Sequence, residues 1–210
     1  MRIKKNYENR RRHTVLVILI ILLALSSNSL PKIPKFYKNM IYVSSFNGLY
    51  YLLCRRHLVW EFIPNIGVNW LLLRLVHTIL VTPLVVLVFL SEMPHTLSKQ
   101  FIHFARWITI SFAVEYLIHK EDLILYAHGW NVFWSGVIYV KMYFYSYLIT
   151  KRPLLTLFLS FCSTIYFITK FNVPLKKNHI SRYFEPLVDV YYHTFLEDLT
   201  DKKRKIFGLP

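Results

Sequence analysis

The chain has 210 residues, the size of one domain, and 55% of them are apolar, a fraction that excludes an ordinary soluble domain. It carries 26 Lys and Arg against 11 Asp and Glu, but most of the basic residues lie near the two ends of the chain. Because no recognition motif accompanies them, the basic residues do not indicate a nucleic-acid-binding protein. They are typical of a membrane protein whose ends meet the anionic lipids of the cytoplasmic leaflet.

The first two apolar runs, residues 14–30 and 40–54, leave alternatives open. Residues 14–30 end in the polar sequence SSNS, so this run is either a retained membrane span or a cleaved signal peptide. The six basic residues before it favour a retained span. Residues 40–54 are few and include polar side chains, so they cross the membrane only if their helix starts near Phe36. Otherwise they lie in the interface or re-enter the membrane.

Four longer runs follow, at residues 68–90, 101–119, 129–149 and 153–171. Each is close to the roughly 20 apolar residues that one helix needs to cross the hydrocarbon core of a bilayer. Pro83, in the middle of the first of these runs, removes one backbone hydrogen bond and predicts a bend. We therefore predict an all-α fold, a polytopic membrane bundle of five or six transmembrane helices that occupies residues 1–171.

The remaining residues, 172–210, predict a cytoplasmic tail. Apolar side chains recur at spacings of three and four residues after Pro186, which predicts a C-terminal amphipathic helix, and the basic run 202–205 follows it. This helix either lies on the membrane surface, where its basic end meets anionic lipids, or docks on a membrane protein partner.

The orientation is predicted from the Lys and Arg residues between the runs, because short cytoplasmic loops hold the excess of basic residues. With six spans, 17 of the 26 basic residues fall on the side that holds both ends of the chain, six fall on the other side and three lie within runs. We therefore expect both termini in the cytoplasm. Cleavage of residues 14–30 as a signal peptide would leave the tail on the same side.

Three side chains within the runs form a candidate intramembrane polar cluster: Arg74, His77 and Glu115. At about 1.5 Å per residue, Arg74 and Glu115 lie at similar depths on successive helices, which predicts an ion pair between them. His77 lies one turn beyond Arg74 on the same face. The cluster is either a substrate or proton path or a packing interaction, and its position near the interface favours packing. Lys141 has no acid at its depth and is expected to extend toward the outer interface.

The sequence contains no enzyme signature, since GxSxG, HExxH and P-loop motifs are all missing from it. Its nine histidines include no pair spaced to hold a metal ion on one helix face. We therefore expect no catalytic residue, no cofactor and no bound metal.

Two short segments stand out between residues 104 and 175: a helix start, KRPLL, and a turn, HGWN, made of His128, Gly129, Trp130 and Asn131. On these segments the chain resembles an uncharacterised family of small multi-spanning membrane proteins of Gram-positive spore-forming bacteria. The resemblance covers about a third of the chain, and Lys141 departs from the neutral or acidic residues expected at that place. The resemblance implies a location in the bacterial plasma membrane and supplies no catalytic residue.

These patterns favour a non-enzymatic accessory or structural component of the membrane. Its expected partners are the lipid bilayer, anionic lipids at the basic termini and a membrane protein. The alternative is a small solute or ion transporter, which requires Arg74, His77 or Glu115 to face a cavity.

Overall fold

The structure is a computed structural model, and it describes residues 2–54, 57–63 and 70–174 of the chain. Within these ranges the fold is all-α apart from one short two-stranded sheet. The predicted tail helix after Pro186 and the basic run 202–205 lie outside the described residues.

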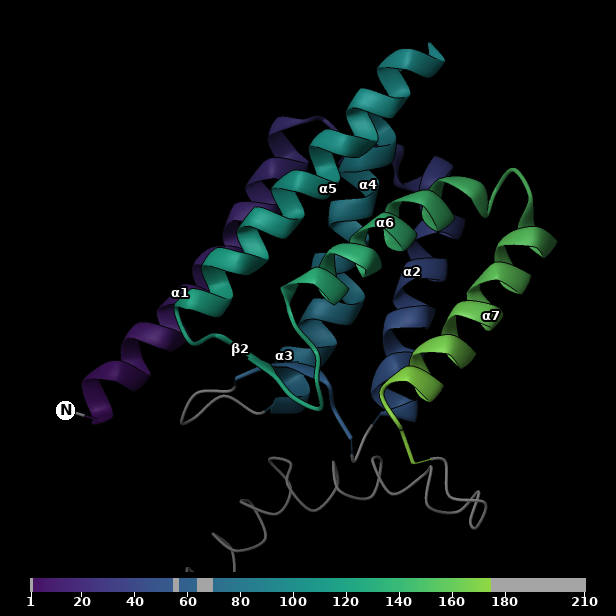
Figure 1. The fold of residues 1–210 in the computed structure, drawn as a ribbon. Coiled ribbons are helices and arrows are strands. Elements are labelled where there is room, and N and C mark those ends of the chain that lie inside the picture. Colours follow the sequence, from purple (N-terminus) through teal and green to yellow (C-terminus); the bar gives the residue numbers. More distant parts are fainter. Residues whose placement is uncertain (1, 55–56, 64–69, 175–210) are drawn as a thin grey trace, which may run out of the picture. The chain divides into compact units, whose positions relative to one another are not determined.

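The described elements form a bundle of helices (Figure 1). In chain order they are α1 (Arg2–Ser26), the 3-10 turn η1 (Leu30–Lys32), α2 (Ile33–Leu53), β1 (Trp60–Phe62), α3 (Trp70–Val76), the π-helix η2 (His77–Val81), α4 (Thr82–Ser91), α5 (Leu97–Lys120), β2 (Ile124–Tyr126), α6 (Val132–Leu148) and α7 (Pro153–Lys170).

Helix α2 begins earlier than the apolar run that predicted it. It starts at Ile33, and Pro34 lies in its first turn, where a missing N–H costs no hydrogen bond. The earlier start meets the condition on where this helix begins, but by length and composition α2 is a candidate span only together with α1, as a bent pair. The axes of α1 and α2 are bent by 77° relative to each other across the short connection between them.

Three helices are long and apolar enough to cross a membrane: Trp70–Ser91, Leu97–Lys120 and Pro153–Lys170. The bent pair His13–Ser26 and Leu30–Leu53 adds a fourth if the pair is counted as one span. Helix α6 has 17 residues, the lower end of the usual length of a span. By length and composition, the described part of the chain therefore holds three to four candidate spans, fewer than the five or six predicted.

The connections between helices gather at two ends of the bundle. In Figure 1 the connections after α1, α4 and α6 lie at the upper end of the helices, and β2 lies at the lower end. At the upper end, the Ser29 and Ser91 hydroxyls are 2.5 Å apart. At the lower end, β1 pairs antiparallel with β2, and a ring nitrogen of His57 donates to the carbonyl of Phe171 over 3.0 Å. The side of the membrane that each end faces stays a prediction.

Helix α4 forms the core of the bundle. Val86, Leu87, Val88 and Phe89 follow one another and are all fully buried, which means that the helix is covered on every side. The ring of Phe89 packs against that of Tyr143 in α6, with 4.6 Å between the centroids. The α4 part of the long apolar run therefore lies inside the bundle, whereas earlier residues of the run, such as Leu72 and Ile79, are exposed.

The structure has a π-helix directly before Pro83, where the sequence predicted a bend. Pro83 has no N–H to offer the preceding turn, so the backbone widens over His77–Val81. The N–H of Thr82 donates to the carbonyl of His77, and the Thr82 hydroxyl donates to the same oxygen over 2.8 Å. His77 is the first residue of this π-helix, and its side chain is buried.

Candidate functional site

Strand β1 connects the side chains of the predicted polar cluster. Its residues contact the three predicted residues, one each: Trp60 contacts Glu115, Glu61 contacts Arg74, and Phe62 contacts His77. The three side chains thus surround one strand instead of forming one cluster of their own.

Arg74 forms its ion pair with Glu61, so the predicted pair with Glu115 is wrong. Nε of Arg74 lies 2.6 Å from Oε1 of Glu61, and Nη2 contacts the same oxygen. The guanidinium also lies over the rings of Trp70 and Tyr51, 4.1 and 5.1 Å from their centroids. The prediction failed because it compared only the acids within apolar runs, whereas Glu61 reaches Arg74 from a segment between them.

Glu115 is buried among neutral donors. Its side chain is 3% exposed. Oε1 accepts from Nε1 of Trp60 over 2.9 Å and from the hydroxyl of Tyr126 over 2.7 Å, and Oε2 accepts from the hydroxyl of Tyr139. Such donors hold a carboxylate in an apolar region without a cation. Burial, followed by the hydrogen bond to Glu115, raises the pKa of Tyr126 above its ordinary value, so this hydroxyl keeps its proton.

His77 lies between aromatic rings. Its side chain is 3% exposed and stacks on Phe62 with 3.7 Å between the ring centroids. The ring of His13 lies 6.3 Å away. Nε2 of His77 has no hydrogen-bond partner among the described residues. Depending on the tautomer, such a buried ring nitrogen can donate a hydrogen bond to a ligand or accept one from it.

A cavity of about 670 Å³ lies among the helices beside this network. Its wall is mostly apolar and comes from α1, α2, α4, α5, α6 and α7, and His77 and Glu115 lie on it. Trp107 also lines the cavity, and its Nε1 has no partner among the described residues. An apolar wall with a few polar groups is typical of small-molecule sites, which measure roughly 300–1,000 Å³. We call this space the central cavity.

The polar atoms on the wall of the central cavity are suited to binding a small molecule. Both oxygens of Glu115 already accept hydrogen bonds, and the wall offers uncommitted polar atoms at His77 and Trp107. Across the described ranges, no three His, Cys, Asp or Glu side chains lie close enough to share a metal ion. The cavity can therefore hold an apolar molecule and direct a hydrogen bond at a polar group on it.

Lys141 does not extend in the expected direction. Its Nζ lies 4.4 Å from the centroid of the Phe167 ring near the end of α7, and the residue lines the central cavity. A cation–π contact with Phe167 takes the place of the expected extension toward the outer interface. The central cavity therefore has one ammonium group on its wall as well as one carboxylate.

The HGWN turn starts α6. His128 and Gly129 both have positive φ, 53° and 82°. Because glycine has no Cβ, Gly129 adopts this backbone conformation without steric cost. Oδ1 of Asn131 accepts from the N–H groups of Phe133 and Trp134 over 3.0 and 3.3 Å, which caps the helix.

The same turn also joins the lower end of the bundle. The ring of His128 stacks on His57 with 3.6 Å between centroids, and Trp130 packs on Phe171 with 4.9 Å between centroids. Nε1 of Trp130 donates to Oγ of Ser135 over 3.0 Å. These contacts give the four residues a structural role at the junction of α6 and α7.

The sequence did not indicate the partners that position the site. Trp60 and Tyr126 lie on strands of three residues each, too short to show an alternating pattern. Trp107 and Tyr139 lie in apolar helices where aromatic residues are common. The one available signal was the position of Tyr126, two residues before the HGWN turn.

Comparison of the chain with protein-family models, with curated proteins and with solved structures found no match.

Proposed function

We propose that the chain is a multi-pass integral protein of the bacterial plasma membrane, with five or six spans and both termini in the cytoplasm. It acts as a non-enzymatic accessory component whose helix bundle holds a hydrocarbon chain, such as the acyl chain of a lipid. The observation that supports this function best is the central cavity, about 670 Å³ in volume and lined mostly by apolar side chains.

The wall of the central cavity selects an apolar occupant. A buried water needs roughly two to four polar partners, which most of this wall does not offer. A hydrocarbon chain from the surrounding bilayer can contact the apolar side chains of the wall without leaving the membrane.

The outer faces of α5 and α7 support a place in the membrane. Both helices carry large apolar side chains that are well exposed: Leu97, Phe101, Leu117, Leu154, Phe158 and Phe161. Soluble proteins rarely expose apolar surface of this extent. Lipid chains cover such faces without cost.

A stability measurement tests whether the central cavity binds a lipid chain. Wild-type protein stripped of lipid by extended detergent washing should unfold at a lower temperature than protein that retains lipid, because an occupant of the folded state stabilises it. In the double variant Val114→Trp with Ile138→Trp, the indole rings occupy part of the cavity whose wall both residues form. The difference in unfolding temperature should shrink in this variant.

The matched control is Leu117→Trp with Val140→Trp. Both residues lie on the same two helices, α5 and α6, and are exposed like Val114 and Ile138, but they do not line the central cavity. This control should keep the wild-type dependence on lipid. An equal dependence on lipid in all three proteins would overturn the proposal.

A small solute or ion transporter is the second candidate, and one observation favours it. His77, Glu115 and Lys141 all lie on the wall of the central cavity. Proteoliposomes loaded with a pH-sensitive or ion-sensitive dye test this candidate. A flux present in the wild type and abolished by Glu115→Gln, in protein that stays folded, would replace the accessory role with transport.

A further inference from the structure

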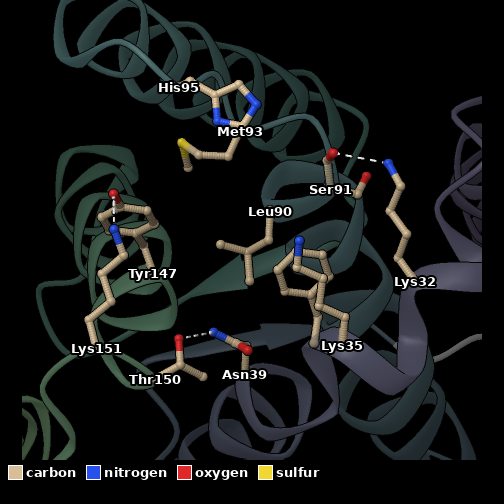
Figure 2. Close-up of a pocket in the computed structure, with 11 residues that line it drawn as sticks. Lys32, Lys35, Asn39, Leu90, Ser91, Met93, His95, Tyr147, Thr150 and Lys151 are labelled. Atoms are coloured by element: carbon tan, nitrogen blue, oxygen red, sulfur yellow. Dashed lines mark hydrogen bonds between the residues drawn. The ribbon is translucent and has the colours of Figure 1, made fainter.

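A second pocket, of about 340 Å³, lies where the connections after α1, α4 and α6 meet (Figure 2). It shares no lining residue with the central cavity. Its walls come from the start of α2, the end of α4 and the end of α6, together with the residues that follow α4 and α6. We call it the lysine pocket, because Lys32, Lys35 and Lys151 line it.

The charges on the lysine pocket are all of one sign. Three ammonium groups line it, the imidazole of His95 adds N–H donor capacity, and no carboxylate is among its lining residues. Glu92, the acid nearest in the chain, is 3.7 Å from Nη2 of Arg106 and does not line the pocket. The pocket therefore has the electrostatic character of an anion site.

The partners of the three ammonium groups are neutral. Nζ of Lys32 donates to the carbonyl of Ser91 over 3.1 Å. Nζ of Lys151 contacts the hydroxyl of Tyr147 and lies 3.9 Å from the centroid of its ring, and Nζ of Lys35 lies 5.3 Å from that of Phe36. None of these contacts cancels a positive charge. An anion can therefore gain hydrogen bonds with N–H groups of all three lysines.

Asn39 provides the second observation, at the base of the pocket. It is 2% exposed, and its Nδ2 donates to the carbonyl of Ser146 over 2.6 Å and to Oγ1 of Thr150 over 3.4 Å. Oδ1 has no partner among the described residues. Figure 2 shows the amide nitrogen turned toward Thr150 and the oxygen turned the other way, to the side where Lys35 lies. A buried acceptor in this position calls for a donor from a ligand.

We propose that the lysine pocket binds a phosphate ester that carries a hydroxyl group. The phosphoryl oxygens accept hydrogen bonds from Lys32, Lys35 and Lys151, and the hydroxyl donates to Oδ1 of Asn39. This chemistry occurs in the phosphoglycerol headgroup of an anionic lipid and in free glycerol phosphate.

The surroundings of the lysine pocket favour the lipid as the source. Leu154, three residues after Lys151, is 83% exposed, and Leu97, two residues after His95, is 83% exposed. Apolar side chains beside lysines mark the level at which acyl chains meet headgroups. A headgroup at this pocket would leave its acyl chains against α5 or α7.

Purification from vesicles of equal phosphatidylglycerol and phosphatidylcholine tests the site, with native mass spectrometry of the lipids retained. The wild type should retain phosphatidylglycerol preferentially. The triple variant Lys32→Gln, Lys35→Gln, Lys151→Gln should lower that preference by about tenfold, because each charge-assisted hydrogen bond contributes strongly. A control with the same loss of charge at the same end, Lys38→Gln, Lys99→Gln, Arg152→Gln, should keep the preference, since these residues do not line the pocket.

Two further measurements serve as controls. The first tests whether a lost preference reflects misfolding, and the second tests whether the ligand is a lipid or a free solute. The single variant Lys151→Gln, at an exposed position, should lower the preference severalfold, while its neighbour Arg152→Gln should not. Displacement of the bound lipid from the wild type by glycerol 3-phosphate would support the pocket and assign it to a free solute. Equal losses in the pocket and control variants, or no loss in the pocket variants, would overturn the proposal.

Discussion

The carboxylate of Glu115 receives three hydrogen bonds from neutral donors on partly buried side chains, so its removal leaves those donors without this partner. We expect Glu115→Ala to lower the free energy of unfolding by about 2–4 kcal/mol, since each unsatisfied buried donor costs about 1–3 kcal/mol. Thermal unfolding in mild detergent measures the loss. Glu92→Ala removes an exposed carboxylate 3.7 Å from Arg106 and should change stability by less than about 1 kcal/mol. Equal losses in the two variants would contradict the network around Glu115.

The ion pair between Arg74 and Glu61 predicts energetic coupling between these residues. Their side chains are 13% and 21% exposed, and the guanidinium also contacts two aromatic rings. A double-mutant cycle with Arg74→Ala and Glu61→Ala should give a coupling energy of about 1–3 kcal/mol. The same cycle on the exposed pair of Arg106 and Glu92 should give about 0.2–1 kcal/mol. Additive effects at Arg74 and Glu61 would show that the pair contributes nothing.

Residue types in the sequence identified Arg74, His77 and Glu115 as unusual, and all three are substantially buried in the structure. Their partners were not predictable in the same way. An ionisable residue in an apolar run signals that it needs a partner, but nothing in the run says which segment supplies it. Here the partners come from β1, which lies between the apolar runs 40–54 and 68–90.

At the scale of elements, the apolar runs predicted where helices occur better than where they begin. Helix α2 extends to Ile33 because Pro34 is compatible with a first turn, a signal outside the apolar run itself. Pro83 predicted a change of backbone geometry at the correct place, and the change is the π-helix His77–Val81. Strands β1 and β2 were missed because three residues are too few for a periodic pattern.

The cap on α6 gives a prediction for one element. Asn131→Ala removes the oxygen that accepts from the N–H groups of Phe133 and Trp134. We expect a loss of about 0.5–2 kcal/mol in the free energy of unfolding, measured by thermal unfolding. Asn131→Asp keeps an acceptor and should stay close to the wild type. A loss as large for Asp as for Ala would show that the side-chain oxygen does not act as a cap.

For the whole molecule, counting charges between runs predicted which side of the membrane each loop faces, and this orientation stays a prediction. The central cavity could not be predicted, because it depends on side chains from six helices that pack together only in the folded bundle. An apolar residue that lines a cavity and one that faces lipid look alike in a sequence.

The predicted orientation is testable by labelling in intact cells. In a background with Cys54→Ala and Cys162→Ala, Lys99→Cys should react with a membrane-impermeant maleimide, because this loop is expected on the outer side. Lys120→Cys, at the opposite end of the same helix, should react only after lysis. The reverse pattern would place both termini outside.

The presence of a lipid chain in the central cavity is tested most directly by native mass spectrometry of the protein extracted from its host membrane. The account predicts a bound lipid on the wild type and on the control with Leu117→Trp and Val140→Trp. It predicts one bound lipid fewer on the variant with Val114→Trp and Ile138→Trp, whose residues line the central cavity, while a lipid held at the lysine pocket remains. A wild type that carries no lipid under conditions that keep it folded, or a filled variant that carries as many lipids as the wild type, would contradict the account.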